Sequence, residues 1–227
     1  MQKAFLGPCI AGIVFILWAG CSHKNEIAQQ ESTETVRPAP APAPADDRPV
    51  IVAFGDSLTA GLGVDPRLSY PAILEQQLAA RGHHYRVVNA GVSGDTTGGG
   101  LTRVDSVLAY KPRIVILALG ANDGLRGLPV ETTKTNLEQI IQVIQRAGAK
   151  VVLAGMTLPP NYGPEYVRSF EQVFVDLSKK YNSPRIPFLL EGVAAVAGRM
   201  QSDGLHPNAA GHKIIAGTVM RVLEPLL

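Results

Sequence analysis

Cysteine is nearly absent from this sequence. The 227-residue chain has two cysteines, Cys9 and Cys21, and both precede the part of the chain with globular composition. That part therefore has no disulfide, no thiol nucleophile and no cysteine metal site. Charge of one sign is also scarce, because the net charge is +2 and no long run of Lys or Arg occurs. This charge balance gives no basic patch that could bind nucleic acid, so we predict no nucleic-acid partner.

The patterns that bind metals, phosphates or dinucleotides are missing as well. No HxxxH or DxD spacing occurs and His206 is the one imidazole in a suitable loop, so we predict no metal and no other cofactor. The segment 92–100 (VSGDTTGGG) lacks the Gly-Lys-Ser/Thr ending of a P-loop. The segment 61–66 (GLGVDP) lacks the third glycine of a dinucleotide fingerprint. The sequence GDSLT at 55–59 is not a G-x-S-x-G elbow, which argues against an ordinary α/β-hydrolase.

No apolar run is long enough for a typical transmembrane helix. Residues 4–19 are predominantly apolar but shorter than the ~20 residues that span a bilayer. With a basic start and two small residues before Cys21, residues 1–20 are typical of a signal peptide. The ending resembles a bacterial lipobox, which implies cleavage before Cys21 and acylation of its thiol, although Trp18 replaces the usual leucine. The alternative is an ordinary secretory signal or an uncleaved anchor.

Residues 21–49 are predicted to form a disordered tether. They are polar, end in PAPAPAPADDRP and have no apolar periodicity, so they cannot bury enough surface to offset the entropy of ordering. Alternating Pro and Ala favour an extended polyproline spacer of about 3.1 Å per residue. Ser22 is not the aspartate associated with retention in the inner membrane. We therefore expect a lipid-anchored protein of a bacterial cell envelope, at the outer membrane and facing the periplasm.

Residues 50–227 are predicted to form one α/β domain. Five runs are continuously apolar, as expected for parallel strands covered on both faces: 50–55, 86–91, 113–120, 150–155 and 185–190. Amphipathic segments alternate with them and are predicted helices: 70–81, 101–109, 130–147, 165–181 and 209–223. This order predicts a three-layer α/β/α sandwich around a parallel sheet. Ligands should then bind at the carboxyl ends of the strands.

Polar loops follow the predicted strands, and one of them contains Ser57. A serine hydroxyl is a poor nucleophile unless an imidazole within hydrogen-bond reach activates it. The domain's other histidines lie before a strand or inside a predicted helix, which leaves His206. Asp203 precedes it by three residues, so a turn can return the carboxylate to one ring nitrogen and leave the other for Ser57. The alternative is that Asp203 and Asn208 only cap the last helix and His206 is a surface histidine.

Two further loop residues suit an oxyanion hole. Gly94 lies after the second strand, and its backbone N–H can approach a ligand closely. Asn122 lies directly after the third strand, and its side-chain amide is a donor. The backbone N–H of Ser57 is the third candidate donor. Taken singly, Gly94 is also compatible with a helix entry and Asn122 with an Asx turn.

The four elements resemble the GDSL or SGNH hydrolase superfamily: Ser in GDSL, a Gly, an Asn in GxND, and DxxH. The longer strings GDTTGGGLTR (94–103), LGANDGLRGLP (119–129) and LPPNYGPEY (158–166) look like the bacterial branch of arylesterases, acyl-CoA thioesterases and lysophospholipases. The resemblance implies a flavodoxin-like fold with a five-stranded parallel sheet.

The same resemblance assigns roles to residues. It implies that Ser57 is the nucleophile, His206 the general base and Asp203 its orienting partner. It also implies an oxyanion hole made by the backbone amides of Ser57 and Gly94 and the side chain of Asn122.

In that family the loop after strand four borders the acyl site. Here the loop is 156–166, and its apolar wall is predicted from Leu158, Pro159, Pro160 and Tyr162. A rigid Pro-Pro turn of structural value is the alternative.

We therefore predict a serine esterase that hydrolyses small-molecule or lipid acyl esters and thioesters through a covalent acyl-enzyme. The other hypotheses are a carbohydrate or peptidoglycan O-deacetylase and a non-catalytic binding module of the cell envelope.

Overall fold

Five parallel strands form the centre of the computed structural model, which describes residues 46–227. The sheet order is β2-β1-β3-β4-β5. This is the flavodoxin-like order, and it confirms the predicted fold class. The strands are β1 (Val50–Gly55), β2 (Arg86–Gly91), β3 (Ile114–Ala118), β4 (Lys150–Ala154) and β5 (Arg185–Ile186).

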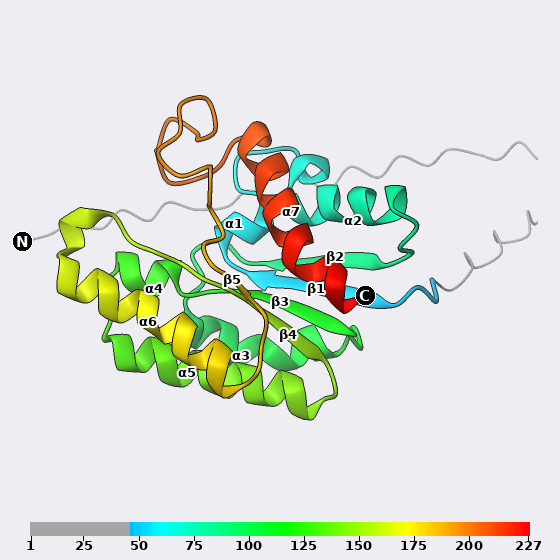
Figure 1. The fold of residues 1–227 in the computed structure, drawn as a ribbon, viewed down its shortest axis with the longest axis horizontal. Helices are drawn as coiled ribbons and strands as arrows, with labels where there is room; N and C mark the ends of the chain where they lie inside the picture. Colours follow the sequence, from blue (N-terminus) through cyan, green and yellow to red (C-terminus); the bar gives the residue numbers. More distant parts are fainter. Residues whose placement is uncertain (1–45) are drawn as a thin grey trace, which may run out of the picture. The chain divides into compact units, whose positions relative to one another are not determined.

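Helices cover both faces of the sheet, so the predicted three-layer sandwich is confirmed (Figure 1). One face carries α2 (Tyr70–Ala80) and α7 (Ala209–Leu223). The other carries α3 (Thr97–Leu108), α5 (Val130–Arg146) and α6 (Pro164–Lys180). Short elements complete the described fold: α1 (Ser57–Ala60), α4 (Ala121–Leu125), η1 (Pro66–Leu68), η2 (Pro160–Tyr162) and η3 (Glu224–Leu226).

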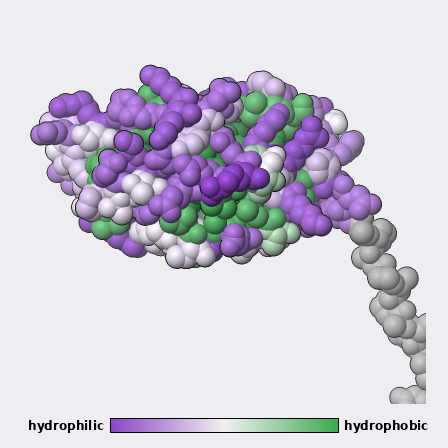
Figure 2. All heavy atoms as spheres, turned by 90° about the horizontal axis from the view of Figure 1, so that it is seen from below, coloured by the Kyte–Doolittle hydropathy of each residue, from purple (hydrophilic) through white to green (hydrophobic). Residues whose placement is uncertain are grey.

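The outer surfaces of α5 and α6 are polar because each helix buries only one stripe. Seen from below, on the side of these helices, the molecule is largely hydrophilic, with smaller apolar areas (Figure 2). The buried stripes consist of aliphatic and aromatic side chains at helical spacing: Leu137, Ile140, Ile141 and Ile144 in α5, and Phe170, Val173, Phe174 and Leu177 in α6. Within residues 46–227, no helix combines the length and the apolar content needed to cross a membrane.

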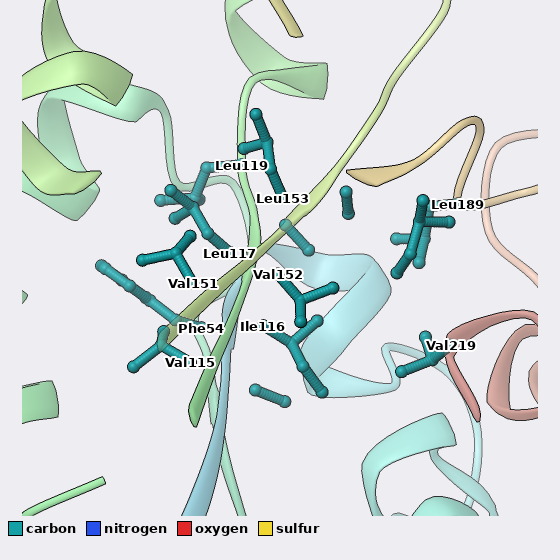
Figure 3. Packing of buried hydrophobic residues seen from close by; sticks show 14 of the residues in the cluster. Phe54, Val115, Ile116, Leu117, Leu119, Val151, Val152, Leu153, Leu189 and Val219 are labelled. Carbon is teal, nitrogen blue, oxygen red and sulfur yellow. The ribbon is translucent and has the colours of Figure 1, made fainter. Parts of the chain in front are cut away.

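The core lies on both sides of the sheet. Figure 3 shows Val115 and Leu117 pointing to the side of Phe54, while Ile116 points to the opposite side with Val219 of α7. All five side chains are fully buried. Burying such a side chain stabilises the fold by about 1.5–3 kcal/mol. Two covered faces explain why the inner strands β1 and β3 are apolar at every position rather than at every second one.

Two predicted elements were wrong in their extent. The run 185–190 is a strand only at Arg185–Ile186, because Pro187 has no backbone N–H for a further ladder bond. The helix predicted from residue 101 begins at Thr97, since the Thr96 side chain caps it by accepting the N–H of Gly99. The glycines at 98–100 have low helix propensity, which is why the sequence alone placed them in a loop.

The N-terminal predictions fall mostly beyond the described part of the chain. The signal peptide 1–20, the lipidation site Cys21 and residues 21–45 of the tether lie outside it. Arg48, near the end of the predicted tether, contacts the domain: its guanidinium pairs with Glu75 of α2 at 2.9 Å and donates to the carbonyl of Tyr85 at 3.3 Å.

Candidate active site

Three strands end at one level and place three polar loops side by side. In the register of the sheet, Gly55 of β1 lies opposite Gly91 of β2 and Ala118 of β3. The chain leaves β1 through Asp56, whose carboxylate caps α1 by accepting the N–H of Leu58 at 3.0 Å. Ser57 is therefore the first residue of α1, where backbone N–H groups have no partner within the helix.

Ser57, His206 and Asp203 form a chain of hydrogen bonds. His206 Nε2 lies 2.9 Å from Ser57 Oγ, and His206 Nδ1 lies 2.6 Å from Asp203 Oδ2. The other oxygen of Asp203 accepts the backbone N–H of Leu205 at 2.9 Å and that of His206 at 3.0 Å. The backbone N–H and then the ring of His206 lower the pKa of Asp203 to about 2. Asp203 is thus ionised at neutral pH and favours a His206 tautomer that carries its proton on Nδ1.

The segment around His206 is anchored at both ends. The carbonyl of His206 accepts the N–H of Gln201 at 2.8 Å, and Met200 forms an antiparallel bridge with Pro207. Asn208 then caps α7, because its side-chain oxygen accepts the N–H of Ala210 at 3.0 Å. The capping role expected of Asn208 and the contact between His206 and Ser57 therefore occur together.

Asn122 and Gly94 lie on neighbouring loops. Asn122, in α4, donates from Nδ2 to the carbonyl of Asp95 at 2.9 Å, and a longer contact of 3.4 Å joins it to Asp56 Oδ2. Gly94 is the third residue of a turn closed by Asp95 N–H on the carbonyl of Val92, and its φ of 81° is the conformation that favours glycine there. Asn122 borders the cavity beside Ser57, whereas Gly94 is not among the residues that line it.

Asp56 is a buried carboxyl next to Ser57. Only 1% of the surface of Asp56 is exposed to solvent. Burial is the main cause that raises the pKa of Asp56, to about 6, and the hydrogen bond from Leu58 N–H opposes it. Asp56 was not predicted from the sequence as a residue of the site. Its burial involves segments that are distant in the sequence, such as the one that carries Asn122, and no local pattern reveals such contacts.

An apolar cavity of about 370 Å³ opens beside Ser57 and His206. Of the predicted acyl wall, Leu158, Pro159 and Pro160 line it. Tyr162 does not, because its hydroxyl turns away to donate to the carbonyl of Leu125 at 2.8 Å. A second part of the lining was not predicted from the sequence and comes from the segment after β5: Phe188, Leu190, Ala194, Ala195 and Met200. The sequence signal for this segment was Pro187, because a proline there indicates that the chain leaves the sheet after Ile186.

No metal ligand set accompanies this cavity. Across residues 46–227, no three His, Cys, Asp or Glu side chains are grouped so that they could hold a metal ion. The chemistry available at the cavity is that of a hydroxyl, an imidazole, carboxylates and amide donors.

Comparison with known proteins places this geometry in a family. The model of the GDSL-like Lipase/Acylhydrolase family matches residues 53–214. The chain is 39% identical over 213 residues to Esterase TesA of Pseudomonas aeruginosa, which covers 93% of this chain and 98% of that protein. It is 37% identical over 178 residues to thioesterase 1/protease 1/lysophospholipase L1 of Escherichia coli, covering 78% of this chain and 84% of that protein.

Solved structures agree with the sequence relatives. A crystal structure of TesA matches with a TM-score of 0.76 at 44% identity, over 78% of this chain and 99% of that one. The matched range 53–214 includes Ser57, Asn122 and His206. The chain belongs to the GDSL-like lipase/acylhydrolase family, and it is a hydrolase of that family.

Proposed function

We propose that this protein is a serine esterase that hydrolyses acyl esters and thioesters through a covalent intermediate on Ser57. The observation that carries the proposal is the hydrogen-bond chain from Asp203 through His206 to Ser57 at the mouth of an apolar cavity. The names of the relatives support the substrate classes, because one is an esterase and another a thioesterase and lysophospholipase.

The first half of the reaction transfers the acyl group to the enzyme. His206 Nε2 takes the proton of Ser57 Oγ as Oγ forms a bond to the carbonyl carbon of the substrate. Asp203 stabilises the resulting imidazolium through Nδ1–H. When the tetrahedral intermediate collapses, the bond to the leaving oxygen or sulfur breaks, and His206 returns its proton there. The alcohol or thiol departs and an ester on Ser57 remains.

The second half returns the enzyme to its starting state. His206 takes a proton from water, and the water oxygen attacks the acyl-enzyme carbonyl. Collapse of this second intermediate breaks the bond to Ser57 Oγ, which regains a proton from His206. The carboxylic acid leaves, and no cofactor is consumed.

Asn122 is proposed as the side-chain donor of the oxyanion hole. Its amide group has two hydrogens, and the carbonyl of Asp95 holds one of them at an N–O distance of 2.9 Å. The second hydrogen points to Asp56, but the distance from Asn122 Nδ2 to Asp56 Oδ2 is 3.4 Å, which is too long for a strong hydrogen bond. This second N–H could donate to a developing oxyanion instead, because little hydrogen-bond energy to Asp56 would be lost. The backbone amides of Ser57 and Gly94 are proposed to complete the oxyanion hole.

The cavity favours an acyl chain over an acetyl group. Its side chains are mainly aliphatic, including Leu125, Met156 and Leu158 on one side. A volume of about 370 Å³ is within the range of small-molecule sites. An acetyl group would leave most of this apolar surface unfilled. This disfavours the alternative of a carbohydrate or peptidoglycan O-deacetylase.

The test is hydrolysis of p-nitrophenyl octanoate and acetate by the wild type and by Ser57→Ala. We expect the octanoate to be preferred and Ser57→Ala to lose several orders of magnitude in turnover. An organophosphonate should label the wild type stoichiometrically and leave Ser57→Ala unlabelled. Equal hydrolysis by both proteins would refute the nucleophile, and an unlabelled, inactive wild type would favour a non-catalytic binding module.

We further propose that acylated Cys21 anchors the protein in the bacterial cell envelope, at the outer membrane and facing the periplasm. The support is the signal-like segment 1–20 and the small residues before Cys21. Mass spectrometry of the mature N-terminus should find a lipid-modified Cys21, and Cys21→Ser should move the protein from the membrane fraction to the periplasmic fraction. A free thiol on a protein that still sediments with membranes would contradict the proposal.

A further inference from the structure

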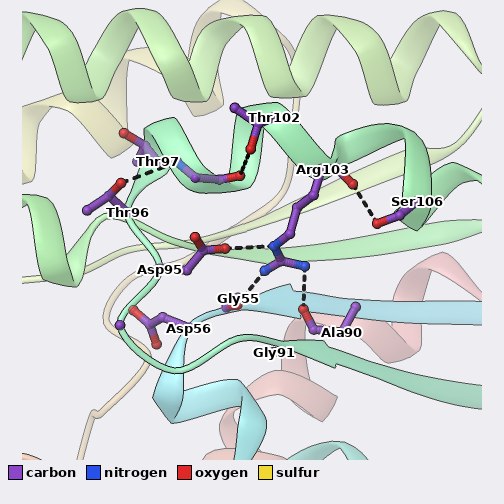
Figure 4. A network of polar contacts seen from close by, with 12 residues as sticks. Gly55, Asp56, Ala90, Gly91, Asp95, Thr96, Thr97, Thr102, Arg103 and Ser106 are labelled. Carbon is purple, nitrogen blue, oxygen red and sulfur yellow. Dashed lines mark hydrogen bonds and ion pairs between the residues drawn. The ribbon is translucent and has the colours of Figure 1, made fainter.

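One arginine, Arg103 of α3, connects the ends of two strands and the loop that follows the second (Figure 4). Its Nε donates to Asp95 Oδ2 at 2.7 Å, and its two terminal nitrogens donate to the carbonyls of Ala90 at 3.0 Å and Gly55 at 2.9 Å. The guanidinium also lies over the ring of Phe54, 4.6 Å from its centroid. Each edge of the planar group therefore has a defined partner.

The pair is largely shielded from water. The side chains of Arg103 and Asp95 are 21% and 12% exposed, the lowest exposures of any Arg or Lys ion pair among the described residues. A Cβ at Gly99 would lie 2.0 Å from Asp95 Oδ1, so the absence of a side chain there allows the carboxylate to lie against α3. A lysine cannot reproduce the arrangement, because an ammonium is a point charge without the planar fork.

The groups that Arg103 holds all adjoin the proposed catalytic residues. Gly55 is two residues before Ser57, and Asp95 directly follows Gly94. The carbonyl of Asp95 accepts one hydrogen of Asn122. Arg103 itself is absent from the lining of the cavity, so it would act on the substrate only through these neighbours.

We propose that Arg103, paired with Asp95, is a positioning residue that fixes the oxyanion donors relative to Ser57. This inference rests on the proposed function. The ion pair fixes the Asp95 backbone, the Asp95 carbonyl orients the Asn122 amide, and the contact with the Gly55 carbonyl fixes the strand end that carries Ser57. A displacement of about 1 Å at a reacting group can cost about 10²-fold in rate.

The test compares Arg103→Lys with Arg81→Lys in the full-length protein. Arg81 makes an exposed ion pair with Glu224 at 2.7 Å, so the control applies the same chemical change far from the site. With p-nitrophenyl octanoate, Arg103→Lys should lower kcat by about 10–100-fold. KM should change by less than about 3-fold, because the cavity lining is intact. The control should match the wild type.

A second comparison separates positioning from a general loss of structure. In an Asn122→Ala background, Arg103→Lys should cost less in kcat than it does in the wild type, since one of the donors that it positions is already gone. A structural defect would instead multiply with the Asn122 change. Phosphonate titration of Ser57 reports the folded, active fraction, and all rates are expressed per titrated site. An equal loss in both backgrounds, or a loss confined to KM, would overturn the proposal.

Asp95→Asn breaks the same pair from the other side while keeping the size of the side chain. It should show the same reduction in kcat and the same dependence on Asn122. If both variants failed to fold, the pair would belong to the fold rather than to the site, and the proposal would be overturned. If Ser57→Ala retained full activity in this assay, the proposed function itself would fail. Wild-type rates in Arg103→Lys with an inactive Ser57→Ala would refute the positioning role alone.

Discussion

Replacing Asp56 by Asn should stabilise the protein at neutral and alkaline pH. Burial raises the pKa of Asp56 from 3.8 to about 6, so the folded protein holds a proton that the unfolded chain releases between these values. The folded state binds more protons in this window, and stability therefore falls as pH rises through it. About two pKa units correspond to about 3 kcal/mol lost above pH 6. Asparagine avoids this loss, because its amide does not ionise in this pH range.

The substitution keeps the cap of α1 and replaces Asp56 Oδ2, which has a long 3.4 Å contact with Asn122 Nδ2, by an amide nitrogen. The side-chain oxygen of asparagine can still accept the N–H of Leu58, so the cap of α1 remains. With an m value of about 2 kcal/mol/M in urea, a gain of up to about 3 kcal/mol would move the unfolding midpoint by up to about 1.5 M. The assay is urea unfolding of the wild type and Asp56→Asn at pH 8 and pH 4.

The difference between the two proteins, rather than either midpoint, is the diagnostic quantity. Other titrating groups such as His212 are common to both proteins, so they cancel in the difference. The gain should be present at pH 8 and nearly absent at pH 4. A gain of the same size at both pH values, or a destabilised variant at pH 8, would show that burial of the Asp56 charge is not what costs stability.

Three further predictions concern the site and its support. Asn122→Ala should lower kcat by about 10²–10³-fold with little change in KM, and steady-state hydrolysis of p-nitrophenyl octanoate measures both. Asp203→Asn should cost less than the ~10⁴-fold seen for buried triad aspartates, since the Asp203 side chain is 43% exposed and water can partly replace it; a loss of 10⁴-fold or more would contradict this. Burial lowers the pKa of His212 from 6.5 to about 4, so its contribution to stability is complete above pH 6.5 and is lost as pH falls through 4. Urea unfolding of Asp56→Asn from pH 7 to 4 should show this decline, and adding His212→Gln should reduce it; an unchanged decline would refute the assignment.

Sequence patterns predicted the fold because the sheet has a strong signature. Its inner strands are covered on both faces, which makes them continuously apolar, and the intervening helices have clear amphipathic stripes. The loops were located by the same reasoning, since chemistry follows the carboxyl ends of parallel strands. His206 was singled out by elimination among the histidines, and the structure places its ring beside Ser57.

The features of the site that the sequence did not predict depend on contacts between segments that are distant in the chain. Arg103 belongs to an amphipathic helix, where an arginine is ordinarily a solvated surface charge; its partners at Gly55 and Ala90 come from two different strands. Tyr162 was assigned to the acyl wall by its position in the loop, but its hydroxyl is drawn to a carbonyl of α4. Long-range hydrogen bonds of this kind leave no periodic trace in a sequence.

The early end of β5 has a consequence for how this enzyme can diversify. Because the sheet stops at Ile186, one continuous stretch of chain supplies both a cavity wall, through Phe188 and Leu190, and the imidazole of His206. Ser57 and Asn122, the proposed nucleophile and side-chain donor, come from other loops, and Arg103 contacts the residues beside those loops rather than this stretch. We therefore predict that exchanges at the cavity-lining residues Phe188, Leu190 and Ala194 change the proposed acyl selectivity without displacing Ser57. These residues lie between Pro187, which ends β5, and the bridge between Met200 and Pro207.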